Sequence, residues 1–213
     1  MKNTIAFILF CLLNCCSYAQ KTIEQHLNYS PDKKIVLDIQ IADSIHIISW
    51  NKNEVFAKAS VNINDNKDND AYITAFDAAG SKVSITAKID DKKNRQRNDS
   101  CNCNYHSDIY WDVYVPEGAD FSVETINGNI IIEGKTAAVR AHSISGFIDL
   151  QFADSRKADL KMSTISGTIY TNLAINSGDG NRDGNAVAYQ YNGGGDDVEL
   201  ETISGDIFLR KAQ

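Results

Sequence analysis

Apolar residues recur at every second position through most of the chain, which is the repeat of a β-strand with one buried face. Four such sets lie in the first half, at Ile35 to Ile41, Val55 to Ile63, Val83 to Ile89 and Ile109 to Val115. Helical spacing is nearly absent, and only Ala71 to Ala79 could form a turn of helix. The pattern predicts an all-β protein.

Two polar segments interrupt the strand pattern. Residues 90–104 contain charges, Asn and two cysteines, and residues 176–197 are rich in Gly, Asn and Asp. Neither segment has the apolar side chains that would order it by burial, so both are expected to be surface loops.

The second half contains four segments that align without gaps on a Thr/Ser-Ile-Ser/Asn-Gly-x-Ile core. They begin at Phe121, Val139, Leu160 and Val198. The first three follow one another at intervals of about twenty residues, and the last interval is about twice as long. A strand-patterned repeat of this length is typical of stacked coils, each of which forms one layer.

The apolar spacing changes by one residue inside each repeat. Phe121 and Val123 are two positions apart, whereas Ile126 follows Val123 by three, which places an extra residue, and hence a corner or bulge, at Glu124–Thr125. Glycine then takes an inward position where a side chain would not fit. Stacking would form an internal column of isoleucines and an external polar column. The internal column would contain Ile126, Ile144, Ile165 and Ile203, and the external one Asn127, Ser145, Ser166 and Ser204.

These features predict a short β-solenoid, with β-helix-like stacked coils. Residues 20–115 would be N-terminal strands that continue or cap the stack, and residues 116–213 the four-copy repeat, with a loop inserted at 176–197 that obscures a fifth coil. A β-sandwich with strands of similar sequence is the alternative.

The N-terminus has the three parts of a secretory signal peptide. Lys2 is basic, Ile5 to Leu13 is apolar but too short to span a bilayer, and Ser17-Tyr18-Ala19 supplies small residues for cleavage. Residues 1–19 would be removed and residues 20–213 would form one domain. Leu12-Leu13-Asn14-Cys15 also looks like a lipobox, in which case Cys15 would carry a lipid anchor. Either interpretation predicts an exported chain that is periplasmic, outer-membrane-associated or secreted.

Composition excludes some partners. The net charge of −7 argues against nucleic acid and anionic membranes. Beyond the signal peptide only Cys101 and Cys103 remain, which is too few for a disulfide framework, so the core must hold the fold.

The repeated Ile-Ser-Gly-x-Ile cores, the entry Val113-Tyr-Val-Pro-Glu-Gly118 and the closing segment from Asn192 to Lys211 carry a family resemblance. Together they resemble the DUF4097-type family of exported, adhesin-like β-solenoid proteins of bacteria. The resemblance extends from about Pro31 to the end and is best after Tyr110. It implies a β-solenoid fold and an adhesion-related role, and it supplies no catalytic residues.

Two motifs could bind metal, although simpler explanations exist for both. Asp179-Gly-Asn-Arg-Asp-Gly184 matches the start of a calcium loop, but the twelfth position is the neutral Gln190. Cys101-Asn-Cys103 could be a redox pair, a strained disulfide that pins a loop, or half of a metal site with His106. No metal or cofactor site is predicted.

The remaining candidates are histidines, aromatic residues and carboxylates. The histidines have no partner at a recognisable catalytic spacing, and His142 is expected to be a solvated strand residue. The aromatic cluster could stack on sugars, with half of its members in the core and half on the surface. The histidines are His26, His46, His106 and His142, and the aromatic residues are Tyr105, Tyr110, Trp111 and Tyr114.

The sequence therefore favours a non-catalytic envelope or surface protein that binds a protein or glycan partner, or that has a structural or envelope-stress role. A small glycan-active enzyme is the alternative, and it would use the outward carboxylates Glu124, Asp149 and Glu201.

Overall fold

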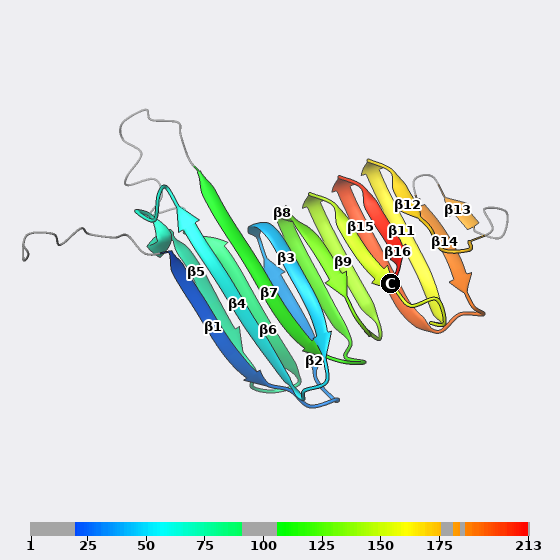
Figure 1. Ribbon diagram of the computed structural model, residues 1–213, viewed down its shortest axis with the longest axis horizontal. Helices are drawn as coiled ribbons and strands as arrows, with labels where there is room; N and C mark the ends of the chain where they lie inside the picture. Colours follow the sequence, from blue (N-terminus) through cyan, green and yellow to red (C-terminus); the bar gives the residue numbers. More distant parts are fainter. Residues whose placement is uncertain (1–19, 91–105, 176–180, 184–185, 213) are drawn as a thin grey trace, which may run out of the picture.

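The structure is a computed structural model that describes residues 20–90, 106–175, 181–183 and 186–212. These residues form sixteen hydrogen-bonded strands and one short 3-10 turn, and none of them lies in an α-helix. The prediction of an all-β protein is confirmed. Figure 1 shows the strands side by side along the long axis, from β1 (Lys21–Asn28) at one end to β13 (Asn181–Asp183) at the other.

The strand pairs form two ladders that share β8 (Phe121–Glu133). The first ladder pairs the first half of β8 with β2 on one side and β9 on the other, and the second ladder pairs its second half with β3 and β10. In order, the first ladder contains β5 (Tyr72–Asp77), β6 (Lys82–Ile89), β2 (Lys34–Ile39), β8, β9 (Val139–Ser145), β15 (Asp196–Ser204), β11 (Ala158–Ser166), β14 (Ala186–Tyr191) and β13. The second contains β1, β4 (Glu54–Ile63), β7 (Ser107–Pro116), β3 (Ile41–Trp50), β8, β10 (Ile148–Phe152), β16 (Ile207–Lys211) and β12 (Ile169–Thr171).

One core joins the two ladders. The buried apolar residues form a single cluster from Leu27 to Leu209. At one end Trp111 of the second ladder donates its indole N–H to the Tyr72 hydroxyl of the first ladder (2.9 Å), which donates in turn to the Ile41 carbonyl (3.0 Å). Burial raises the pKa of Tyr72, so this phenol remains a neutral donor inside the core.

The alternating sets predicted from the sequence are the buried faces of strands. Every second residue from Val55 to Ile63 and from Ile109 to Val115 is fully buried or nearly so. The predicted helical turn at 71–79 is wrong: a 3-10 turn occupies Asn69–Ala71, and β5 follows it. Tyr72 begins that strand because its ring fills the core between the ladders.

The corner in each repeat lies two residues later than the spacing predicted. Thr125 is 4% exposed, whereas Ile126 is 48% exposed and Asn127 also points outward. The extra residue therefore enters at Ile126–Asn127 and not at Glu124–Thr125. The predicted internal isoleucine column is wrong, and all four of its members are exposed: Ile126, Ile144, Ile165 and Ile203. The predicted outer column of Asn127, Ser145, Ser166 and Ser204 does lie at the surface.

The residue that points into the core at each corner is a serine or threonine, and its hydroxyl donates a hydrogen bond to a backbone carbonyl. Ser143 donates to the Gly128 carbonyl of the neighbouring layer (3.3 Å), and Thr202 donates to the Gly146 carbonyl (3.1 Å). Thr164 continues the series with the carbonyl of Gly205 (2.9 Å). A buried hydroxyl with a partner costs little, whereas isoleucine could not satisfy these carbonyls.

The inward glycines are confirmed, and the reason is a backbone contact between layers. A Cβ on Gly146 would overlap the Gly128 carbonyl, and one on Gly205 would overlap the Gly146 carbonyl. A Cβ on Gly128 would stand 2.7 Å from the carbonyl oxygen of Ala42, in the layer formed by β2 and β3. The repeat contact thus continues into the N-terminal half.

The order of the layers differs from the order of the chain. β15 pairs in parallel with β9 on one side and β11 on the other, so the fourth repeat lies between the second and the third. β16 lies likewise between β10 and β12. Figure 1 accordingly marks the C-terminus beside β16, within the row of strands.

The expected fifth coil in 176–197 is also wrong. The described part of that segment contains β13 and β14, and β14 pairs antiparallel with β11. In the described part of the segment, β14 and β13 therefore extend the outer edge of the last repeat by antiparallel pairing, and no further parallel layer precedes β15.

The glycine contact predicts a specific loss of stability. Gly146 and Gly80 both have positive φ, 137° and 78°, but only Gly146 has backbone within reach of a Cβ. Gly80→Ala should cost about 1–2 kcal/mol from its φ alone. Gly146→Ala should cost at least about 2 kcal/mol more, because two packed layers must separate. Urea denaturation measures both, and equal losses would contradict the contact.

Candidate binding groove

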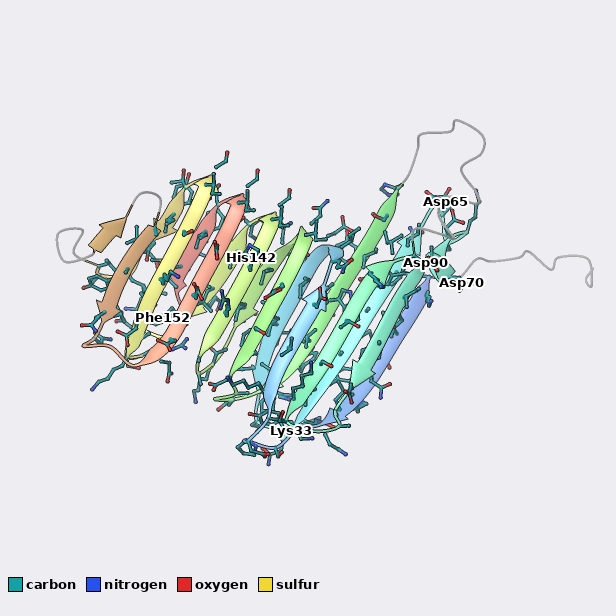
Figure 2. The ribbon with its side chains drawn as sticks, turned by 180° about the vertical axis from the view of Figure 1, so that it is seen from behind. Lys33, Asp65, Asp70, Asp90, His142 and Phe152 are labelled. Carbon is teal, nitrogen blue, oxygen red and sulfur yellow. The ribbon has the colours of Figure 1, made fainter. Side chains whose placement is uncertain are left out.

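A groove of about 330 Å³ opens on the outer face of the first ladder, where β2, β8, β9 and β15 begin. Lys33, labelled in Figure 2, directly precedes β2 and so marks the β2 end of the groove. The groove lining includes two small side chains, Ser122 and Ala138. The lining combines apolar and charged residues, namely Lys34, Ile35, Val36, Asp120, Phe121, Ser122, Ala138, Val139, Arg140, Asp197 and Glu199.

Opposite charges alternate along a row of three strands, and two members of this row, Arg140 and Glu199, line the groove. Glu199 on β15 lies between Arg140 on β9 and Lys161 on β11, because these positions share one row of the parallel register. Its carboxylate is 3.4 Å from Arg140 Nε and 2.6 Å from Lys161 Nζ. Asp120, on the β2 side, accepts the Ala138 backbone N–H (3.1 Å).

The charge column changes two pKa values. The hydrogen bond from Lys161, followed by the charge of Arg140, lowers the pKa of Glu199 against the opposing effect of partial burial. The same hydrogen bond raises the pKa of Lys161. Both shifts keep the pair charged, so the groove presents fixed charges.

A second outward row contains two of the carboxylates proposed for catalysis. Glu124, His142 and Glu201 occupy matching positions on β8, β9 and β15, so the imidazole stands between the two carboxylates. Figure 2 places His142 near the middle of the row of strands. His142 is an outward strand residue, as predicted. Neither glutamate lines the groove.

The third carboxylate, Asp149, does not lie outward in solvent. It is 7% exposed and lies on β10 of the second ladder. Arg210 clamps it through Nε (2.8 Å) and a second guanidinium nitrogen. The predicted trio of Glu124, Asp149 and Glu201 is therefore divided between two ladders, and Asp149 serves to attach β16 to β10.

The other histidines contact surface carboxylates. His26 Nδ1 is 3.2 Å from Glu54, and His106 Nε2 is 3.2 Å from Asp108. His46 has the least exposed side chain of the three and lies between two carboxylates. Its Nδ1 is 3.7 Å from Asp112, and its Nε2 is 3.2 Å from Glu133. Within the described ranges, no three His, Cys, Asp or Glu side chains are grouped as a metal ion would require.

The aromatic candidates divide as the alternation predicted. Trp111 is 1% exposed and Tyr110 is 48% exposed. Tyr114 packs outside the second ladder against Trp50 (5.1 Å between centroids) and Phe56 (5.8 Å). Tyr114 therefore contacts neighbouring rings across the sheet, whereas Tyr110 is exposed to solvent.

Several predicted sites lie wholly or partly outside the described residues. They include Tyr105, the Cys101–Cys103 pair and most of the Asp179–Gly184 calcium motif, of which only the Asn181–Asp183 backbone is described. Among the described residues, no helix is long and apolar enough to cross a bilayer.

Sequence reasoning missed the groove. Arg140, Lys161 and Glu199 take the second position of their repeats, so alignment of the repeats would have found the column. It would not have shown that Glu199 separates the two cations, because that depends on the position of β15.

Comparison with known proteins supports the fold. No protein-family model matches the chain, and no curated protein matches it. Among solved structures, a "putative cell adhesion protein" from Clostridium sporogenes is similar at 12% identity and a TM-score of 0.56, covering 91% of this chain and 100% of that chain.

Two other solved structures show lower similarity at 9% identity and 91% coverage of this chain. A "putative adhesin" from Bacteroides fragilis has a TM-score of 0.34 over 98% of its chain. A "putative lipid binding protein" from Parabacteroides distasonis has a TM-score of 0.24 over 97% of its chain.

The lowered pKa of Glu199 gives a pH-dependent prediction. Lys161→Gln removes the charged hydrogen-bond donor that lowers this pKa most. An NMR titration of the variant should therefore show the pKa of Glu199 closer to the ordinary value of a glutamate. A carboxyl with a lowered folded-state pKa adds stability above its unfolded pKa, and loses it as the pH falls through the folded pKa. The variant should therefore lose less stability on acidification.

Lys58→Gln is the matched control, because Lys58 pairs with Glu24 (3.0 Å) on the second ladder. It should leave the Glu199 titration unchanged. If Lys161→Gln also left it unchanged, the assigned cause would be wrong.

Proposed function

We propose that this chain is a non-catalytic, exported cell-envelope or surface protein of adhesin type, which binds a protein or glycan partner in the groove of the first ladder. The groove is the observation that supports this most directly. Its volume of about 330 Å³ lies within the range of small-ligand sites, and it combines apolar lining with fixed charges of both signs.

The scaffold suits binding because the groove lies on paired strands. Residues on a sheet are held more precisely than residues on loops, so less conformational entropy is lost when a partner binds. The similarity in fold to a structure described as a cell adhesion protein agrees with this role. A purely structural or envelope-stress role would leave the groove without a use.

We also propose that the two ladders form a short β-solenoid. The in-register parallel pairing of the repeat strands and the glycine contact between layers support this description. The insertion of β15 and β16 between earlier layers distinguishes it from a solenoid that winds in chain order.

The alternative of a glycan-active enzyme has less support. Asp149 is committed to Arg210, and Glu124 stands on an open face that does not exclude water. Glycoside hydrolysis uses two carboxylates that flank one bond in a site shielded from solvent.

A binding screen tests the proposal. The purified protein would be applied to arrays of glycans and of bacterial and host surface proteins, and any partner found would be titrated. The indole of Ser122→Trp would fill the groove and exclude the partner from it. Binding should weaken at least about tenfold, because the loss of about 1.4 kcal/mol of binding free energy raises the Kd tenfold.

Ser60→Trp is the matched control, because Ser60 is a half-buried outward residue on the second ladder. Equal loss in both variants would place the site elsewhere. Turnover of a polysaccharide that Glu124→Gln or Glu201→Gln abolished would contradict the non-catalytic assignment.

Export gives a separate prediction. After expression in a bacterial host, the mature N-terminus should be Gln20, because cleavage follows Ala19. Mass spectrometry of the extracytoplasmic fraction would show this. A lipid-modified N-terminus at Cys15 would favour the anchored form, and an intact Met1 in the cytoplasm would refute export.

A further inference from the structure

The repeat places a row of isoleucines at the surface, and the core does not account for it. This isoleucine ridge contains, in spatial order, Ile126, Ile144, Ile203 and Ile165, which are 48%, 41%, 39% and 67% exposed. They occupy the corners of adjacent layers, about 4.8 Å apart. A contiguous apolar row at a surface marks an interaction site more often than isolated apolar residues do.

The columns beside the ridge are polar and mostly uncharged. On one flank lie Asn127, Ser145, Ser204 and Ser166. On the other flank, past the buried hydroxyls, lies the outward row of Glu124, His142, Glu201 and Ser163.

We propose that the isoleucine ridge packs against the ridge of a second copy of this chain, with the two stacks antiparallel and related by a two-fold axis. The isoleucines of two copies have the same spacing, so their side chains can stay aligned along the whole ridge. A partner peptide in an extended conformation would present a side chain about every 6.7 Å on one face, and its side chains would not stay aligned with the isoleucines. A two-fold interface is self-complementary by construction.

The antiparallel arrangement also matches the charges. Reversing one stack places Ile126 opposite Ile165 and Ile144 opposite Ile203 of the second copy. The same reversal places His142 opposite Glu201 of the second copy, twice per dimer. An imidazole N–H then meets a carboxylate on one flank, and amide and hydroxyl groups meet on the other.

The size of the contact sets its strength. Four layers span roughly 15 Å, so the buried area is well below the approximately 800 Å² per partner of a standard interface. The dimer should be weak in dilute solution, with a Kd roughly between 0.1 and 1 mM. It would strengthen where many copies are held at one surface, because tethering raises the effective concentration.

Sedimentation equilibrium of the purified protein up to about 1 mM tests the proposal, with a monomer–dimer equilibrium expected in the stated range. The double variant Ile144→Ser, Ile203→Ser should weaken it at least tenfold and keep the fold, because both side chains are exposed. Ile73→Ser is the matched control, since Ile73 is 39% exposed on β5, far from the ridge, and it should leave dimerisation unchanged.

A charge exchange tests the orientation. His142→Glu alone places two carboxylates opposite one another in a homodimer, and Glu201→Lys alone removes the carboxylate that faces His142, so each variant should remain monomeric. An equimolar mixture of these two variants should dimerise, because one opposed pair then joins the introduced glutamate to the introduced lysine and the other keeps the native contact of His142 with Glu201. Effects within one chain cannot produce that recovery.

Two outcomes would overturn the proposal. A wild-type protein that stays monomeric at 1 mM would assign the ridge to a different partner. A dimer that neither the serine variants nor the mixture affects would use another surface.

Discussion

The contact between one layer's glycine and the carbonyl of the next layer is the constraint on which the stack depends. Where Gly146 meets Gly128, no room exists for a Cβ, and the nearby Ser143 hydroxyl satisfies the same carbonyl. Close approach and hydrogen bonding therefore occur at one point. The strands can turn there from the first ladder to the second without leaving a buried polar group unpaired.

Charge supports the order in which the layers stack. If the repeats followed chain order, Lys161 would lie beside Arg140, and two cations would face each other across one strand spacing. The observed order places Glu199 between them, at 3.4 Å from Arg140 and 2.6 Å from Lys161. On the second ladder, the Asp149–Arg210 ion pair likewise joins β16 to β10 through opposite charges. Opposed charges on neighbouring strands thus favour the observed arrangement over its alternative.

Strand period and glycine positions could be predicted from the sequence, because burial of one strand face and the absence of a side chain both leave clear patterns. The outward direction of Ile126 could not be predicted, because apolar residues usually lie in the core. Nothing in the sequence around Thr125 indicates that its hydroxyl donates to a carbonyl of another layer. The groove could not be predicted either. It depends on which strands are neighbours, and local spacing does not record that.

The central position of β15 and β16 has a consequence for how the protein is made. Residues 196–211 are synthesised after β9 and β11, yet they occupy a place between these strands and their layers. Until they emerge, β9 and β11 have no common neighbour, and the edges of both remain open. The stack can therefore be completed only once residues 196–211 are available, so its layers do not close in the order in which they are synthesised.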